Sequence, residues 1–449
     1  MKRQDLNVLF IVPPGLASER DTRSFGPFKA RAFLSNAGLV LTTLLRKAGY
    51  TARLVDLDYF QAVQGSKFRL ADHVRNLMSD FAPRIACISF LTHQYTIARE
   101  ILRVVKEVNI RCLTIAGGVH VTFDYWSLLR DWEFLDVAVC HAGEMPLLSI
   151  CESLIRGENP SGAGIATRRG CAINYSPAQP PPPDIHEYVG PIEFSMLPDT
   201  RLRESCITML SQYGCNSHCA FCSEPNMWPW QPSMKPTTIL LEDLRTLAIA
   251  GVDRVGIEDS TFSINFRFFE DPSIRDSIQF YALARASMVD DEYARAVRSS
   301  PIGAIIIGGE SASDEILKKV GKGIMAHQVR TACEVLAAHG IAAGVFWILG
   351  LPGETEDTAT QTLIFAEKLK QEGLVAYQDI ALFMPYPGTD IARRPKHYGV
   401  EILHRMWDFY TPSGFARNPA YQLKTLDHQG LTQLYQHAQS FSVEYVPNV

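Results

Sequence analysis

The sequence has 449 residues, 47% of them hydrophobic and 20% charged, which is long enough for two or three globular domains. Its 43 Lys and Arg against 48 Asp and Glu give a formal net charge of -5, and no run of five like charges occurs. This composition argues against a nucleic-acid partner and against a membrane-surface patch. The apolar runs are also far shorter than the roughly 20 residues that a membrane helix needs. We therefore expect a soluble protein.

The N-terminus combines a basic start with only a short apolar stretch, residues 8–12, which ends at Pro13-Pro14. It lacks a small-residue cleavage pattern, so the sequence predicts a first strand here and not a secretory signal, and the expected location is cytoplasmic. Three of the ten cysteines fall within one octapeptide. In a reducing compartment this crowding indicates metal or redox chemistry, and it disfavours a disulfide framework.

Residues 7–155 alternate strand-like and helix-like segments. We expect strands at 7–12, 52–57, 85–91, 112–116 and 137–140, and helices at 39–45, 96–108 and 145–155. Strands that alternate with helices at this spacing imply right-handed crossovers and a parallel sheet covered on both faces. The sequence thus predicts an α/β, doubly wound, Rossmann-like domain at 1–157, with its ligand crevice at the carboxyl ends of the strands.

The character changes at residues 158–204, where glycines, a hairpin-like stretch and a polyproline run predict a linker. Strand and helix then alternate again, with expected strands at 207–211, 254–257, 278–283, 304–307, 343–349 and 376–383. Six such units predict a partial (β/α)6 barrel over 205–390, followed by a C-terminal extension over 391–449. In a barrel of this kind the chemistry lies at the carboxyl ends of the strands.

The three clustered cysteines lie in the loop directly after the first expected barrel strand. Cys215, Cys219 and Cys222 are separated by three and two residues. Thiolates suit iron-sulfur clusters or zinc, and such a loop can supply three of the four iron ligands of a cuboidal cluster. The alternative is structural zinc, which needs a fourth ligand such as Cys206 or His218, but no second pair of short-spaced cysteines follows.

This three-cysteine motif, with the aromatic Phe221 before its last cysteine, resembles the cluster loop of the radical S-adenosylmethionine (SAM) superfamily. The resemblance implies that Cys215, Cys219 and Cys222 bind a [4Fe-4S] cluster whose open iron is chelated by SAM. It further implies reductive cleavage of SAM to a 5'-deoxyadenosyl radical. An electron donor such as flavodoxin or ferredoxin would then be a partner, together with a small-molecule substrate.

Other barrel segments are similar to the same superfamily. The resemblance makes Glu258 and Asp259, after the second strand, candidates to hold the methionyl ammonium of SAM. Arg285, after the third strand, is the candidate for its carboxylate, which a guanidinium can bind bidentately. Glu310 and Ser311, after the fourth, would meet the ribose and methionine. The alternative for each residue is a helix cap or a surface ion pair.

Residues 7–155 resemble the cobalamin-binding-type domain that precedes the barrel in one radical SAM subgroup. The matching residues at strand ends include Ser89, Thr92, Gly117 and Gly118, which the resemblance makes candidates for contact with cobalamin. Glycines at a strand end permit close approach of a cofactor to the backbone. The Asp-x-His-x-x-Gly motif is absent, so His120 is not assigned as a cobalt ligand. The alternative is a domain that keeps the fold without the cofactor.

The other cysteines outside the loop flank apolar segments and are expected to be buried small hydrophobes: Cys87, Cys112, Cys140, Cys151, Cys171 and Cys333. Trp228 and Trp230, just past the loop, either line a substrate pocket or pack on the barrel rim.

Three functions fit these features. The first is a radical SAM enzyme that uses cobalamin to methylate an unactivated carbon of a small metabolite or natural product. The second is a cobalamin-independent radical dehydratase, epimerase or rearrangement enzyme, similar to the diol dehydratases of aminoglycoside biosynthesis. The third is a noncatalytic cobalamin or iron-sulfur sensor, which would leave the acidic and arginine residues of barrel strands two to four without a role.

Overall fold

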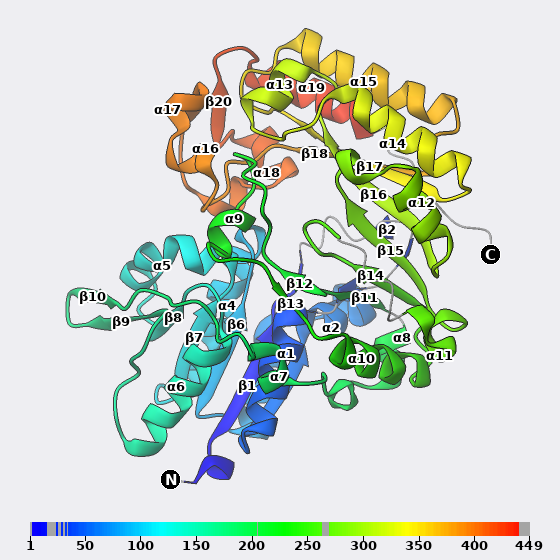
Figure 1. Cartoon of the computed structure of the whole chain (residues 1–449). Coiled ribbons are helices and arrows are strands. Elements are labelled where there is room, and N and C mark those ends of the chain that lie inside the picture. The colour runs from blue at the N-terminus through cyan, green and yellow to red at the C-terminus, as the bar shows by residue number, and fades with distance from the viewer. Residues whose placement is uncertain are drawn as a thin grey trace. The chain divides into compact units, whose positions relative to one another are not determined.

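The computed structural model describes residues 2–15, 24–25, 28–29, 32–33, 35–203, 205–262 and 269–439. The chain divides into two compact units (Figure 1). Unit 1 comprises Met1–Asp21, Arg31–Ser205 and Thr238–Thr246, and unit 2 comprises Thr22–Ala30, Cys206–Thr237 and Leu247–Val449. Each unit is built around one sheet and is described by itself.

The sheet of unit 1 has the order β10-β9-β8-β7-β6-β1-β5. Its parallel strands are β1 (Asn7–Val12), β5 (Thr51–Asp56), β6 (Ile85–Ser89), β7 (Leu113–Gly117) and β8 (Val137–Val139). The chain order 2-1-3-4-5 is that of a flavodoxin-like doubly wound fold, whose topological switch point lies between β1 and β6. The doubly wound domain predicted from the sequence is confirmed.

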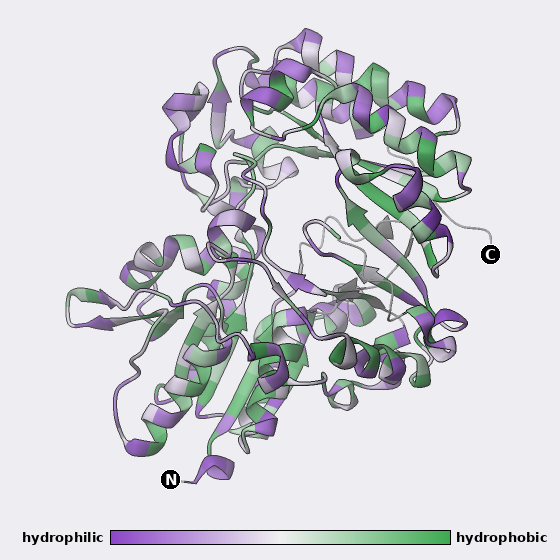
Figure 2. Ribbon diagram, viewed as in Figure 1, coloured by the Kyte–Doolittle hydropathy of each residue, from purple (hydrophilic) through white to green (hydrophobic). Residues whose placement is uncertain are grey.

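Amphipathic helices connect these strands and cover the sheet. They are α1 (Asn36–Lys47), α2 (Leu57–Gln64), α3 (Leu70–Phe81), α4 (Tyr95–Val108), α5 (Val119–Asp131) and α6 (Glu144–Arg156). The strands are nearly continuous apolar runs because a parallel sheet is buried on both faces. In β1 every residue after Asn7 is buried. Figure 2 shows the hydrophobic residues concentrated along the strands of this sheet.

Residues 158–204, for which the sequence predicted a linker, contain regular structure. A hairpin of β9 (Ile165–Arg169) and β10 (Ala172–Tyr175) adds two antiparallel strands to the edge of the sheet at β8. Two short helices follow, α7 (Ile185–Val189) and α8 (Asp199–Arg203). Arg201 of α8 is buried and pairs with Asp56 at the end of β5. This segment therefore belongs to unit 1.

Unit 2 contains six consecutive parallel strands in the order β18-β17-β16-β15-β14-β11. They are β11 (Ser205–Met209), β14 (Arg254–Ile257), β15 (Gln279–Ala284), β16 (Ile302–Glu310), β17 (Ala342–Leu349) and β18 (Tyr377–Leu382). The connecting helices of unit 2 include α12 (Asp291–Arg298), α13 (Asp314–Lys319), α14 (Ala326–Ala338) and α15 (Glu356–Gln371). Most of α10 (Thr237–Ile249), which follows β13 in the chain, is assigned to unit 1. The predicted partial barrel is confirmed.

The part of the C-terminal extension that is described forms small elements of unit 2: α16 (Asp390–Arg393), α17 (Pro395–Tyr398), β19 (Val400–Ile402), α18 (Pro412–Arg417), β20 (Tyr421–Leu423) and α19 (His428–Gln439). Tyr421 is buried between the rings of Phe383 and Phe415, which lie 5.3 and 5.0 Å from it. The extension is thereby packed on the end of the barrel. Among the described helices of the whole chain, none has the length and apolar character required to cross a membrane.

Candidate cluster and cofactor sites

The three-cysteine loop lies between β12 (Gln212–Tyr213) and α9 (Glu224–Met227). Strand β12 pairs with β13 (Ser233–Met234), and the ring of Tyr213 stacks on Trp228 at 4.9 Å with an interplanar angle of 7°. This stack fixes the base of the loop, which gives Trp228 a packing role. Cys219 is buried, and Cys215, Phe221 and Cys222 are half-buried.

Backbone amides donate to two of the three sulfurs of this loop. The amide of Ser217 lies 3.4 Å from Cys215 Sγ, and the amide of Glu224 lies 3.4 Å from Cys222 Sγ. Such N–H···S contacts stabilise thiolate charge and are a recognised influence on iron-sulfur clusters. Three thiols on one loop with amide donors form a donor set that fits a cluster with one open iron.

The described side chains do not form a four-ligand zinc site, and the side chain of Cys206, one suggested fourth ligand, lies outside the described ones. A zinc ion needs four ligands that converge on one point at about 2.0–2.3 Å. Within the described ranges, no group of three or more His, Cys, Asp or Glu side chains is arranged to hold a single metal ion. His218, one of the suggested fourth ligands, is exposed. Burial raises the pKa of the Cys222 thiol to about 12, and the amide of Glu224 opposes this shift.

Two adjacent acidic residues at the end of β14 have different surroundings. Asp259 is buried and accepts hydrogen bonds from the amides of Ser211 and Gln212 at 2.7 and 3.0 Å, and also from the Ser211 hydroxyl. Its carboxylate thus holds the turn from β11 into the cluster loop. Glu258 accepts from the Tyr281 hydroxyl at 2.8 Å through Oε1. Burial raises the pKa of both carboxyl groups.

Arg285, at the end of β15, contacts the cluster loop. One terminal nitrogen donates to Ser217 Oγ at 2.7 Å, and the other donates to the backbone carbonyl of Lys322. The sequence suggested that this guanidinium meets the carboxylate of SAM. In the structure both of its terminal nitrogens bind groups of the protein.

Glu310 ends β16 in a strained backbone conformation, with φ at +61° in the left-handed region. The register with β17 shifts between Gly308 and Glu310. Its buried carboxylate pairs with the buried ammonium of Lys322 at 2.6 Å. Lys322 was not among the residues predicted from the sequence, although it lies between two glycines, Gly321 and Gly323.

Ser311, the other candidate at this strand end, is fully buried. Its hydroxyl lies 3.3 Å from Thr362 Oγ1 and accepts from the amide of Ser313 at 3.1 Å. Ser313 in turn caps the N-terminus of α13. The Ser311 side chain therefore contacts Thr362 of α15 and the residue that caps α13.

In unit 1 the switch point between β1 and β6 is the position at which an open sheet of this topology binds its ligand. Gln94 joins the loops that follow the two strands. Its Nε2 donates to the carbonyl of Pro13 at 3.1 Å, and its Oε1 accepts from the amide of Leu91 at 3.0 Å. Gln94 was not among the residues predicted from the sequence.

The two glycines after β7 differ in the space around them. A β-carbon on Gly118, which has φ of +98°, would lie 2.7 Å from Ser89 Oγ and 3.0 Å from the backbone of Phe90. This glycine is required by the close approach of the β6 and β7 loops within the protein. At Gly117 the nearest atom would be the carbonyl oxygen of Val139 at 3.5 Å, an ordinary contact. Of the two glycines, Gly117 is therefore the one at which a β-carbon would fit without a close contact.

Thr92 and His120 face the interior of unit 1. His120 is fully buried, its Nδ1 lies 3.0 Å from Thr92 Oγ1, and its ring lies 5.3 Å from that of Phe90. Burial lowers the pKa of His120 to about 3, so its imidazole is neutral at physiological pH. This position agrees with leaving His120 unassigned as a cobalt ligand. Thr92 serves to orient a core histidine.

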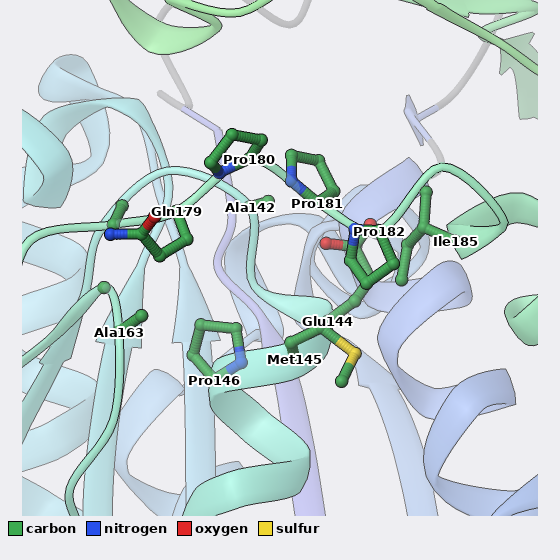
Figure 3. Close-up of a pocket in the computed structure, with 12 residues that line it drawn as sticks. Ala142, Glu144, Met145, Pro146, Ala163, Gln179, Pro180, Pro181, Pro182 and Ile185 are labelled. Atoms are coloured by element: carbon green, nitrogen blue, oxygen red, sulfur yellow. The ribbon is translucent and has the colours of Figure 1, made fainter.

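A pocket of about 230 Å³ lies elsewhere in unit 1, between the start of α6 and residues 178–185 (Figure 3). Pro180, Pro181 and Pro182 form one side, and the buried Glu144 lies on the other. The pocket contains none of the four residues predicted to contact cobalamin. The structure also corrects one expectation for unit 1, because Cys171 is exposed at the β9–β10 turn.

Comparison with known families agrees with the two units. The family model described as the radical SAM superfamily matches residues 209–366, and that of the B12 binding domain matches residues 35–150. The chain contains a radical SAM domain and a B12-binding domain. It is a radical SAM enzyme with an N-terminal B12-binding domain, as the sequence predicted. These domains imply a [4Fe-4S] cluster, SAM and cobalamin as cofactors.

Two curated relatives of this radical SAM enzyme cover most of its length. The uncharacterized methyltransferase PH0819 of Pyrococcus horikoshii is 25% identical over 378 residues, which is 81% of this chain and 80% of the relative. The anaerobic magnesium-protoporphyrin IX monomethyl ester cyclase of Rubrivivax gelatinosus is 23% identical, over 78% of this chain and 64% of the relative.

Solved structures share the fold of the radical SAM enzyme. The radical SAM methyltransferase TsrM of Kitasatospora setae, with tryptophan substrate and a SAM analog bound, superposes with a TM-score of 0.69 at 15% identity, over 90% of this chain and 79% of TsrM. The cobalamin-dependent SAM radical enzyme OxsB superposes with a TM-score of 0.66 at 19% identity, over 88% of this chain and 56% of OxsB.

Proposed function

We propose that this radical SAM enzyme uses cobalamin to methylate a carbon atom of a small molecule. The observation that carries the proposal is the presence in one chain of a cysteine loop suited to a cluster and a doubly wound B12-binding domain. Support comes from PH0819, which is named a methyltransferase and matches across both domains, and from the fold shared with TsrM.

Each cofactor has protein groups suited to hold it. Cys215, Cys219 and Cys222 bind the cluster, and Glu258 pairs with the methionyl ammonium of SAM through the carboxylate oxygen that Tyr281 does not contact. When bound, the reduced cluster supplies an electron that cleaves SAM, and cobalamin carries the methyl group. Gly117 and the loops at the β1–β6 switch point receive cobalamin in unit 1.

Asp259 and Thr92 have supporting roles in this proposal. Asp259 holds the backbone at the base of the cluster loop, so it positions the loop and leaves the ammonium of SAM to Glu258. Thr92 holds a neutral histidine in the core of unit 1. Glu310 contributes a buried negative charge, balanced by Lys322, at the end of β16.

A second function is a radical reaction without methyl transfer. The similarity to an enzyme named a cyclase, over 78% of this chain, supports it. Both functions begin with SAM and a reduced cluster, so they are separated by the fate of the methyl group.

The test is incubation of anaerobically reconstituted protein with a pool of small metabolites and either ordinary or methyl-deuterated SAM. We expect product ions that appear as pairs separated by the mass of the deuterium label, with the label located on carbon by fragmentation. New products that appear in both incubations without any label would favour the radical reaction without methyl transfer.

A further inference from the structure

The turn at the end of α13, residues 320–323, lies against the cluster loop within unit 2. The carbonyl of Val320 accepts a hydrogen bond from the amide of Ala220 at 2.8 Å. Gly321 has φ of +66°, and a β-carbon there would lie 3.4 Å from the carbonyl oxygen of His218. The 320–323 turn is therefore shaped to contact the backbone between the first and last cysteines of the loop.

Arg285 joins this turn to the loop. Its two terminal nitrogens donate to different partners, one to Ser217 Oγ and one to the carbonyl of Lys322. The amide of Ser217 itself contacts Cys215 Sγ at 3.4 Å. A guanidinium is a rigid planar fork, so two simultaneous hydrogen bonds fix both partners in a way that a lysine ammonium does not reproduce.

The turn is also fixed from the barrel side. The Lys322 ammonium pairs with Glu310 at 2.6 Å, and each of the two side chains is only 9% exposed. A β-carbon on Gly308 would lie 2.6 Å from the Lys322 nitrogen, so this glycine provides the space for the ion pair. Removal of one partner from a buried ion pair strongly destabilises a protein, because the other charge is left unpaired. The cluster loop, the third strand and the fourth strand are thus connected through one turn.

We propose that Arg285 is a positioning residue which, together with the 320–323 turn, holds the cluster loop in the shape that receives the cluster. In this role it acts on the loop and not on the carboxylate of SAM. The inference rests on the proposed function only in taking residues 215–222 as the cluster loop. It concerns the shape of the cluster loop before SAM or cobalamin binds.

The test is hydrogen-deuterium exchange of the full chain after the metal has been removed, followed by mass spectrometry of peptides covering 215–222. The amide of Ala220 reports directly on the contact with Val320. We expect Arg285→Gln to speed exchange in this loop by about tenfold or more, because hydrogen bonds to a charged group are lost. Exchange in β15 and β16 should stay unchanged. Arg295→Ala, at an exposed arginine of α12, is the control and should change neither.

The reconstituted variants provide the second measurement. Arg285→Gln and Arg285→Lys should lose iron to a chelator faster than the native protein, whereas SAM affinity per remaining cluster should stay unchanged. The proposal would be overturned if the variants bound SAM more weakly but matched the native protein in loop exchange and iron loss. Arg285 would then be assigned to the carboxylate of SAM. If Arg285→Gln fails to fold, Ser217→Ala decides, because faster loop exchange supports the proposal and unchanged exchange overturns it. A failure of methyl transfer changes none of these results.

Discussion

The hydroxyl of Tyr281 donates a hydrogen bond to Glu258 Oε1 at 2.8 Å, across the neighbouring strands β15 and β14. Tyr281 is 1% exposed, so its hydroxyl meets the carboxylate from a buried position. Asp259, the next residue, instead accepts from the backbone of Ser211 and Gln212. The sequence gives no reason to prefer one of these two adjacent acidic residues, but their hydrogen-bond partners distinguish them.

Glu258→Gln should weaken SAM binding by about tenfold or more, because the methionyl ammonium loses a charged partner. Thermal stability should change little. Asp259→Asn is the matched comparison and should mainly lower stability, since the native Asp259 carboxylate accepts hydrogen bonds from two backbone amides at the base of the cluster loop. Calorimetry with SAM and thermal unfolding measure the two effects. Equal SAM affinity in native protein and Glu258→Gln would contradict this assignment.

Tyr281→Phe should shift the pH dependence of SAM binding. Burial raises the pKa of Glu258 and the hydrogen bond from Tyr281 lowers it, so removal of the hydroxyl raises the pKa further. The ammonium of SAM needs the ionised carboxylate, so affinity is lost as the pH falls through this pKa. The acid limb of the binding curve should therefore move to higher pH in the variant. A uniform loss of affinity at every pH would indicate a purely structural role for Tyr281.

The strands of both sheets could be predicted from the sequence because they are parallel and buried. Such strands are continuous apolar runs, so the bounds of β1 (Asn7–Val12) and β14 (Arg254–Ile257) match the sequence prediction. The sequence did not predict that the β9–β10 hairpin joins the sheet. Its strands are short and partly polar, and prolines follow them. Cys171 was expected to be buried, but it lies in the turn of that hairpin.

The candidate sites were predictable in position but not in side-chain direction. The cysteine spacing located the loop, and strand ends located Glu258, Arg285 and Glu310. A motif does not say whether a hydroxyl or carboxylate turns toward a ligand or toward the protein. The hydrogen bond between Ser311 and Thr362 depends on a helix about fifty residues away, and the sequence around Ser311 carries no sign of it.

Cys219→Ala should abolish the cluster. Anaerobically purified native protein should contain about four irons and four sulfides per chain, and the variant should contain almost none. The unfolding of unit 1 should be unaffected, because the loop belongs to unit 2. Cys171→Ala, at the exposed cysteine, is the control and should keep the iron. Stoichiometric zinc without iron-sulfur absorbance after anaerobic reconstitution would refute the cluster.

Gly117→Ala and Gly118→Ala should separate cofactor binding from folding in unit 1. A methyl group at Gly117 meets only an ordinary contact with Val139, so the protein should stay stable while cobalamin binding falls. At Gly118 the methyl group approaches Ser89 and Phe90 at 2.7–3.0 Å in a left-handed conformation, so stability itself should fall. Cobalamin retention and thermal unfolding are the measurements. Full cobalamin retention by Gly117→Ala would place the cofactor away from this strand end.

The central claim is that the chain transfers the methyl group of SAM by way of cobalamin. Its most direct test mixes the reconstituted protein with reduced cobalamin and methyl-deuterated SAM under anaerobic conditions and measures the nucleoside products. We predict S-adenosylhomocysteine, with an equal amount of deuterated methyl group recovered on cobalamin. Release of 5'-deoxyadenosine without S-adenosylhomocysteine, by protein that retains no cobalamin, would contradict the claim.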